Sequence, residues 1–410
     1  MSADRTSASL ETVKSPTAPS TLHNPTMVNG EILPLTSVRF FAAFHVVLYH
    51  TWGIFLPSLA IPAYITWFLS LGYAGVSIFF VLSGYILCVV YMHRNTPPSV
   101  DRKQFFLARF ARIYPVYAFS LIASVPFVVM LLGDRSVMSK MLRMISPSVV
   151  NFGLLQAWKP ALGGGWNVPA WSISAEAFFY LLFPILAVRI WTRVQRPLLL
   201  AFLLWCLTVT ISLITIHIPF LQSAVHRHGD EFLRFNPLLR LPEFLIGVAV
   251  ATWQQRTKFV APWWLAIGSI LATLALVPLL VKCSRVLVSN GLLAPLFAVM
   301  LVGFGSSNGY FERLLSFRPF VLLGRASFSL YLLHLPVLFW FCFLERGRNA
   351  LPFSEQQLFR PTSTGPGPLI AYLAITLAIS IASYEWLESS GRRFLLSRLG
   401  QKRPITKPAR

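Results

Sequence analysis

Apolar runs long enough to cross a bilayer recur along almost the whole chain, and this repetition constrains the fold more than any other feature. A transmembrane helix needs about 20 mostly apolar residues. Hydrophobic residues make up 55% of the 410 residues and charged residues only 12%, about half the charged share of a soluble domain. The sequence therefore predicts an all-α polytopic transmembrane bundle of about ten spans. We place the spans near residues 35–56, 68–92, 113–132, 171–190, 198–219, 238–254, 262–281, 288–305, 326–344 and 368–388.

The distribution of charge sets the expected topology. The formal net charge is +21, but the basic residues lie between the apolar runs. There the positive-inside rule and an anionic membrane surface explain them, so we do not expect nucleic-acid binding. With a cytoplasmic N-terminus and ten spans, 23 of the 35 lysines and arginines fall on the cytoplasmic side. This bias predicts that both termini are cytoplasmic.

The chain is expected to have three parts. Residues 1–32 are rich in Ser, Thr and Pro and contain no signal-peptide core, which predicts a disordered polar tail. Residues 33–390 form the transmembrane domain, and residues 391–410 form a basic cytoplasmic tail. The long connection at residues 134–170 is expected either to lie along the membrane interface or to dip into the bundle.

The first span contains three ionisable residues in the stretch "RFFAAFHVVLYH". Each such group at bilayer depth costs on the order of 3 kcal/mol, so a function is the default interpretation. Arg39 and His50 are eleven residues apart, which is about 20° from three full helical turns and about 16 Å along the axis. Both should therefore face the bundle interior, whereas His45 faces elsewhere. The alternative is that Arg39 is a positive-inside anchor and that His50 is a helix–helix hydrogen-bonding residue.

A second pair of basic residues occurs in "RFARIYP". Arg109 and Arg112 stand at i and i+3 on one helix face, at the expected cytoplasmic edge. Paired guanidinium groups suit a phosphate-bearing ligand that arrives from the cytoplasm. As a positive-inside anchor the pair would be equally ordinary.

An acid interrupts the apolar segment "WSISAEAFFYLLFPIL". Glu176 follows Trp171, Ser172 and Ser174, and an intramembrane carboxylate is a functional candidate by default. Three roles remain open for it: orienting a histidine, positioning a hydroxyl acceptor, or pairing with an arginine.

Three further residues stand out in later spans. Arg240 and Glu243 lie at i and i+3, which favours a local ion pair over a site. His334 precedes Pro336 and has no role that the sequence assigns. The four cysteines form no CxxC pair and show no metal-ligand spacing, so no metal is expected.

Seven motifs follow one another along residues 33–398. They are "LTSVRFFAAFHVVLYH", "GYAGVSIFFVLSGYIL", "RFARIYPVY", "WSISAEAFFYLLFPIL", "LRLPEFLIGV", "LLGRASFSLYLLHLPV" and "YEWLESSGRRFL". In this order they resemble the membrane-bound acyltransferase 3 family. The resemblance implies transfer of an acyl group, commonly acetyl, from cytoplasmic acyl-CoA to a hydroxyl of a sugar or small molecule.

The family motifs match specific positions of this sequence. A basic residue, ten intervening residues and a histidine match Arg39 and His50, and the paired-arginine motif matches Arg109 and Arg112. The Trp-Ser-x-Ser-x-Glu motif matches residues 171–176. Ser77 and Ala177 depart from the family pattern, since many relatives carry an acid at each of these positions.

The resemblance and the residues together imply a set of roles. His50 and Glu176 are expected to be catalytic, with His50 acting as a general base or as a transient acyl carrier. The phosphates of acyl-CoA are expected to bind Arg39, Arg109 and Arg112, and the acceptor is expected to bind Trp171 and Ser174.

Other interpretations stay open at this stage. The acceptor is expected to be a cell-envelope glycan or, as the alternative, a small-molecule glycoside or antibiotic. A proton-coupled transporter would also place His, Arg and Glu in its spans, but no internal repeat is visible. A non-catalytic sensor or scaffold would tolerate loss of His50. The family likeness implies a bacterial cytoplasmic membrane.

Overall fold

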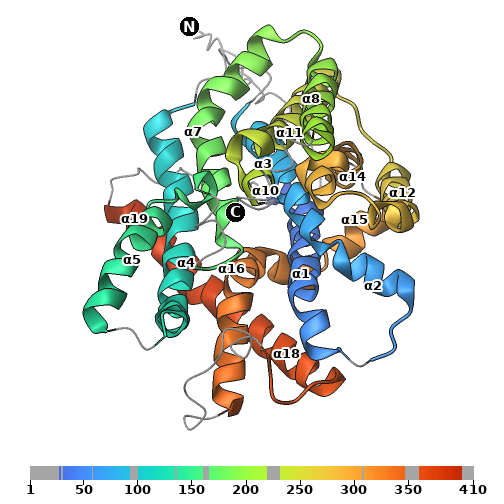
Figure 1. The fold of residues 1–410 in the computed structure, drawn as a ribbon. Helices are drawn as coiled ribbons and strands as arrows, with labels where there is room; N and C mark the ends of the chain where they lie inside the picture. Colours follow the sequence, from blue (N-terminus) through green and yellow to red (C-terminus); the bar gives the residue numbers. More distant parts are fainter. Residues whose placement is uncertain are drawn as a thin grey trace, which may run out of the picture.

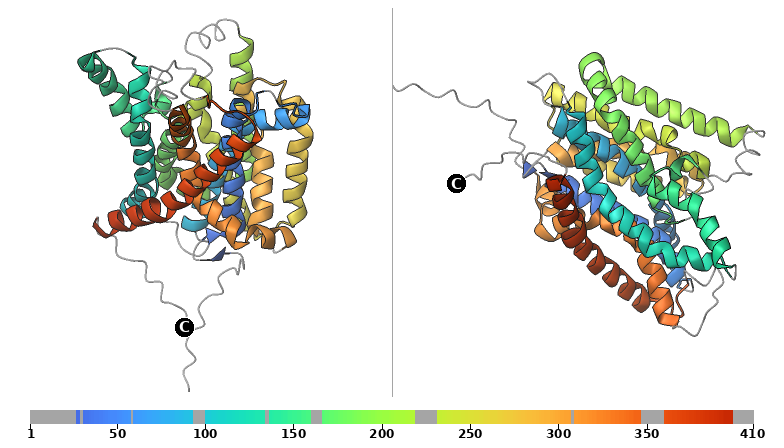
Figure 2. Two further views of the ribbon diagram at one scale, coloured as in Figure 1. Left: turned by 90° about the horizontal axis from the view of Figure 1, so that it is seen from below. Right: turned by 90° about the vertical axis from the view of Figure 1, so that its left-hand side faces the viewer.

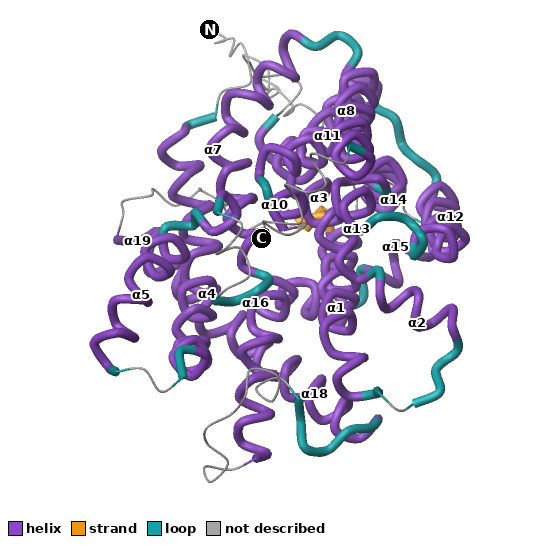
Figure 3. Tube along the Cα trace, viewed as in Figure 1, coloured by secondary structure: helices purple, strands orange, loops and turns teal. Residues whose placement is uncertain are grey.

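The computed structural model describes residues 27–28, 31–57, 59–92, 100–133, 136–159, 166–218, 231–306, 309–346 and 360–398. Within these ranges the chain is almost entirely helical (Figure 3). Its two short strands, β1 (Met27–Val28) and β2 (Glu31–Ile32), pair antiparallel. Most of the expected N-terminal tail and the end of the C-terminal tail lie outside the described residues. Residues 391–398 of the expected C-terminal tail belong to a helix, α19 (Ser389–Arg398).

Ten long helices coincide with the ten expected spans, so the predicted all-α bundle is confirmed (Figure 1). By length and composition, eight stretches of the described chain are apolar enough to cross a membrane. The two long helices outside those eight are the first and the sixth, which contain the ionisable residues noted above. The ten are α1 (Leu33–Phe55), α3 (Gly75–Tyr91), α4 (Arg102–Leu131), α7 (Ala170–Arg193), α8 (Pro197–His217), α11 (Pro237–Thr257), α12 (Trp263–Leu280), α14 (Ala294–Ser306), α16 (Arg318–Arg346) and α18 (Pro366–Ser383).

Further helical segments lie between these ten helices or after the last of them. They are α2 (Ala63–Ser70), η1 (Gly72–Ala74), α5 (Val137–Phe152), η2 (Gln156–Trp158), α10 (Glu231–Phe235), α13 (Arg285–Leu287), η3 (Val288–Leu292), α15 (Tyr310–Leu315) and η5 (Tyr384–Glu388). Of these, η3 and η5 are π-helical segments, a form that often marks functional sites.

The centre of the bundle is built by α1, α3, α11 and α16, while α8 and α12 lie at its periphery with most of their surface exposed (Figure 1). The α3–α11 contact depends on two glycines. A Cβ atom on Gly84 would overlap the carbonyl oxygen of Phe244, and one on Gly247 would overlap that of Val81. Because neither residue has a side chain, the two backbones touch, as is typical of membrane helix pairs.

The described residues of the connection at 134–170 fall into two parts, and their position relative to a membrane stays a prediction. Its first half, α5, projects at the edge of the bundle and exposes apolar side chains such as Met141 and Ile145 (Figure 2). An exposed apolar helix face is suited to lipid. Its second half returns inward, where the buried Gln156 donates hydrogen bonds to the hydroxyl of Tyr117 and the carbonyl of Ala170.

Candidate active site

Two adjoining cavities lie inside the bundle. The first, here called the arginine cavity, measures about 60 Å³. The second, the histidine cavity, measures about 410 Å³ and is therefore the roomier of the two. The polar residues of the arginine cavity include Arg39, Ser83, Arg109, Arg112, Ser172, Glu176 and Tyr180. Those of the histidine cavity include Tyr49, His50, Tyr73, Trp171, Glu231, Arg234, Arg240, Arg285 and Ser289.

Helix α1 supplies one basic residue to each cavity. Arg39 lines the arginine cavity and His50 lines the histidine cavity. His45 points elsewhere: its Nε2 lies 2.9 Å from the carbonyl oxygen of Phe68, and its ring stacks on that of Phe68 at 4.3 Å. The facing that follows from the eleven-residue spacing is therefore confirmed.

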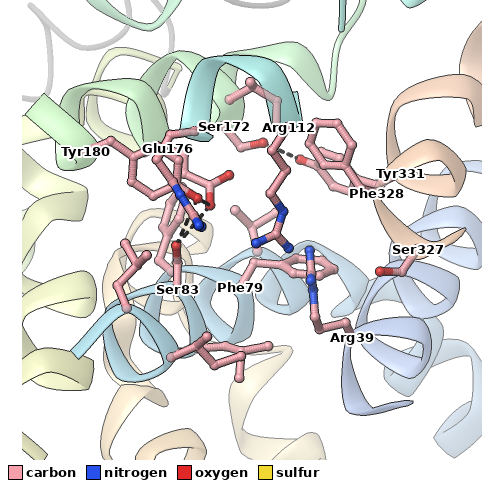
Figure 4. Close-up of a pocket in the computed structure, with 17 residues that line it drawn as sticks. Arg39, Phe79, Ser83, Arg112, Ser172, Glu176, Tyr180, Ser327, Phe328 and Tyr331 are labelled. Carbon is pink, nitrogen blue, oxygen red and sulfur yellow. Dashed lines mark hydrogen bonds between the residues drawn. The ribbon is translucent and has the colours of Figure 1, made fainter. Parts of the chain in front are cut away.

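The arginine cavity concentrates positive charge. Arg39 and Arg112 extend toward each other across it (Figure 4). Arg109 lies over the rings of Tyr91, Phe105 and Tyr180, with centroid distances of 5.8, 5.9 and 6.0 Å. Among the described residues none of the three arginines has a carboxylate within 4 Å. Converging guanidinium groups without a close counter-ion form an anion-binding arrangement.

Glu176 belongs to the arginine cavity. One of its carboxylate oxygens accepts hydrogen bonds from Ser83, at 2.9 Å, and from the hydroxyl of Tyr180. Its charge also acts on Arg39 and Arg112 from beyond ion-pair distance. Glu176 does not line the histidine cavity and makes no hydrogen bond to His50. Of its three open roles, orienting His50 does not fit this geometry, and Glu176 forms no close ion pair with an arginine. Positioning a hydroxyl acceptor stays a prediction.

His50 pairs with a second histidine. Nε2 of His334 lies 3.1 Å from Nδ1 of His50, and Nδ1 of His334 lies 2.8 Å from the carbonyl oxygen of Tyr331. A carbonyl only accepts, so Nδ1 of His334 carries a proton, and Nε2 of the neutral ring is an acceptor. Nδ1 of His50 must then donate, either to His334 or to the carbonyl of Val46 at 3.0 Å.

This hydrogen-bond order fixes the tautomer of His50. With the proton on Nδ1, the neutral ring has an unshared electron pair on Nε2. No described residue forms a hydrogen bond with that nitrogen. A histidine whose other ring nitrogen is held in this way has the arrangement of a general base or nucleophile.

Tyr331 separates the two cavities. It lines both of them, and Val76 is the other residue that they share. The Tyr331 hydroxyl lies 2.8 Å from the Ser172 hydroxyl and 3.2 Å from the carbonyl oxygen of Pro169, so the ring is held in place (Figure 4). Any molecule that extends from the arginines to His50 must pass this residue.

Trp171 and Ser174 lie in different surroundings. Trp171 lines the histidine cavity and stacks on Phe235 with ring centroids 4.5 Å apart, which forms an aromatic wall. Ser174 lines neither cavity: its hydroxyl donates to the carbonyl of Leu154 at 2.6 Å and accepts from the amide of Ala157 at 3.3 Å. The structure therefore does not bring Ser174 together with His50. Instead, the serine links α7 to the backbone of residues 154–157.

The expected ion pair of α11 is confirmed. Arg240 and Glu243 lie 2.9 Å apart, and each side chain is only 1% exposed. Arg240 also donates to the hydroxyl of Ser77 at 3.3 Å. The serine therefore gives the arginine a neutral hydrogen-bond partner beside the charged one.

Several site residues escape sequence reasoning. The sequence assigns no role to His334, because its partner lies 284 positions away. No local pattern distinguishes Ser83 from a small packing residue, or Tyr180 and Tyr331 from the other aromatic residues of the spans. A search for polar groups inside apolar spans would have found the histidine and the serine.

The fold and the site define an integral membrane protein that has two polar cavities in its bundle and a histidine pair between helices. A family model described as an acyltransferase domain matches residues 35–385. Because the match covers most of the chain, this protein belongs to the acyltransferase 3 family and is a membrane acyltransferase.

Individual relatives have low sequence identity to this chain, but they align with it over most of its length. Acyltransferase MdmB from Streptomyces mycarofaciens is 25% identical over 384 residues, which cover 90% of this chain and 93% of the relative. Peptidoglycan O-acetyltransferase OatA from Listeria monocytogenes is 25% identical over 367 residues, which cover 82% of this chain and 55% of the relative. O-acetyltransferase OatA from Staphylococcus aureus is 25% identical over 343 residues, or 76% and 51% of the two chains. No solved structure matches the chain.

Proposed function

We propose that this membrane acyltransferase moves an acetyl group from cytoplasmic acyl-CoA to a hydroxyl of a cell-envelope glycan, with His50 at the reacting centre. The observation that carries this proposal is the fixed tautomer of His50, which leaves an electron pair on its Nε2. His50 lines a cavity of about 410 Å³, which is large enough for an acceptor.

The donor binds from the arginine side. Arg39, Arg109 and Arg112 hold the phosphates of acyl-CoA, because guanidinium groups bind phosphate through charge-assisted hydrogen bonds. The pantetheine arm, which is long and thin, passes Val76 and Tyr331 and presents the thioester to His50. With cytoplasmic termini, the arginine cavity faces the cytoplasm and the histidine cavity opens to the other side of a bacterial cytoplasmic membrane.

At the thioester, Nε2 of His50 takes the proton of the acceptor hydroxyl while the hydroxyl oxygen bonds to the carbonyl carbon. The carbon–sulfur bond breaks, the thiolate receives the proton, and the products are an ester and free CoA. In a second version of this step Nε2 itself bonds to the carbonyl carbon, the carbon–sulfur bond breaks, and CoA leaves as the thiolate. The acceptor hydroxyl oxygen then bonds to the same carbon, the carbon–nitrogen bond to the ring breaks, and the hydroxyl proton goes to the thiolate. Trp171 and Phe235 offer a flat aromatic wall to one face of a sugar ring.

A second candidate acceptor is a small-molecule glycoside or antibiotic. The observation in its favour is coverage: this chain spans 93% of the acyltransferase MdmB, whose name specifies no glycan acceptor, but about half of the relatives that are named peptidoglycan O-acetyltransferases. The two acceptors share the same donor side and the same His50 chemistry, so they differ only in what enters the histidine cavity.

The test is transfer of radiolabel from acetyl-CoA to glycans in membranes that contain the protein. We expect labelling by the wild type and loss of labelling in His50→Ala. The matched control is His45→Ala on the same helix, which should keep most activity because His45 faces Phe68. Equal labelling by a folded His50→Ala variant would falsify the catalytic assignment. Label that appears in a low-molecular-mass glycoside fraction instead would identify the second acceptor.

A further inference from the structure

The histidine cavity has a cationic wall of its own. Arg234 of α10, Arg240 of α11 and Arg285 of α13 line it, together with one acid, Glu231. These arginines are distinct from the three of the arginine cavity and come from other elements of the fold. His50 lines this same cavity.

The charges in this wall do not cancel. Glu243 neutralises Arg240 from behind, at 2.9 Å, and does not itself line the cavity. Glu231 forms no ion pair within 4 Å with any described residue. It is the one acid among the lining residues of the cavity, which also include Arg234 and Arg285. The wall therefore keeps a net positive charge beside His50.

Among the described residues, Arg234 and Arg285 have no carboxylate within ion-pair distance. The Nε atom of Arg234 is buried without a hydrogen bond to any of these residues, and its guanidinium group lies over the ring of Phe235, 5.4 Å from the ring centroid. Arg285 is exposed and pairs with no carboxylate among the described residues. Guanidinium groups that face a cavity without a counter-ion suit an oxyanion, which binds them through paired hydrogen bonds.

We infer that the histidine cavity takes an acceptor with an anionic group, a carboxylate or a phosphate, close to the hydroxyl that is acylated, and that Arg234 and Arg285 bind this group. The inference rests on the proposed function, since it names the acceptor class of the same site. Anions would then bind on both sides of His50. The phosphates of the donor would bind in the arginine cavity, and the charged group of the acceptor would bind in the histidine cavity.

The experiment uses the full-length protein in nanodiscs, with radiolabelled acetyl-CoA and an unlabelled glycan fraction as the acceptor, at constant ionic strength. Glucose, glucose 6-phosphate and glucuronate are added as competitors. We expect the two anionic sugars to inhibit labelling at concentrations at least about tenfold lower than glucose, the effect of one charge-assisted hydrogen bond. The phosphate and carboxylate arms show which oxyanion the wall prefers.

The variants locate the effect. Arg285→Glu reverses charge at an exposed position, and Arg234→Gln removes it at a half-buried one, so both should abolish the preference for anionic sugars. Arg143→Gln is the control, because Arg143 is exposed on α5 and lines neither cavity. Inhibition should be competitive with the acceptor; competition with acetyl-CoA would place the anion in the arginine cavity instead and overturn the inference.

The remaining outcomes are also decisive. Equal inhibition by glucose and its anionic relatives, or an unchanged preference in Arg285→Glu, would overturn the inference and leave the proposed function standing. No transfer to any acceptor by the wild type would overturn the proposed function itself, and the inference with it.

Discussion

Nε2 of His334 stands 3.1 Å from Nδ1 of His50, although 284 residues separate them in the chain. The pair joins α1 to α16, and the carbonyl of Tyr331 sets the direction of its hydrogen bonds. If His50 reacts as we propose, His334 is a positioning residue, which acts on the reaction through the ring of His50.

Replacing His334 should impair catalysis more than donor binding. General base catalysis contributes about 10²–10⁴-fold, and we expect His334→Ala to lose on the order of tenfold to hundredfold in kcat with little change in the KM for acetyl-CoA. His334→Gln should recover part of this loss, because the amide oxygen can accept from Nδ1 of His50. Steady-state kinetics on both variants make the comparison. A change in KM alone, or equal defects in Ala and Gln variants, would leave His334 a packing residue.

The arginine cavity should distinguish acetyl-CoA from a donor without the nucleotide phosphates. We expect the wild type to have a much lower KM for acetyl-CoA than for acetyl-pantetheine. Arg112→Gln should narrow that difference by about tenfold, since a hydrogen bond to a charged group contributes about 1.5–3 kcal/mol. Arg143→Gln serves as the control. If Arg112→Gln leaves the ratio of the KM values for acetyl-pantetheine and acetyl-CoA unchanged, Arg112 does not bind the phosphates of the donor.

The glycine contact between α3 and α11 predicts a stability difference between two Gly→Ala variants. In Gly84→Ala the new methyl group overlaps the carbonyl of Phe244, and overpacking of this kind costs about 1–3 kcal/mol. In Gly268→Ala of α12 no atom lies within 4 Å of the new Cβ, so stability should hold or rise by up to about 1 kcal/mol. Thermal unfolding in detergent compares them, and equal melting temperatures would contradict the close approach.

The buried ion pair of α11 predicts a non-additive result. Glu243→Leu leaves Arg240 charged and almost unexposed, and breaking a buried pair in this way costs about 3–5 kcal/mol. The double variant Arg240→Met/Glu243→Leu should be more stable than Glu243→Leu, because no unpaired charge remains. Unfolding measurements on the single and double variants test this, and simple addition of two losses would speak against the pair.

The parts of the site that the sequence predicts are those set by one helix. The spacing of Arg39 and His50 fixes their facing, since helical geometry is local, and the same holds for Arg240 and Glu243. The ten apolar helices can be predicted for a similar reason, because each is recognised from the length and composition of its own segment.

The remaining parts depend on how separate helices pack. No local pattern pairs His50 with His334 or brings Ser83 to Glu176. From the sequence, Arg234 and Arg285 are only basic residues between spans. No local pattern shows that α10 and α13 pack beside the cavity that His50 lines. Ser174 matched a motif, yet packing turned its hydroxyl toward the backbone of residues 154–157.

The two cavities have only Val76 and Tyr331 in common among their lining residues. Under the proposed function, product release is therefore divided: spent coenzyme leaves from the arginine side and the ester from the histidine side, and neither blocks the exit of the other. Free CoA should consequently compete with acetyl-CoA but not with the acceptor in product-inhibition kinetics, and an acylated glycan that accumulates should compete with the acceptor but not with acetyl-CoA.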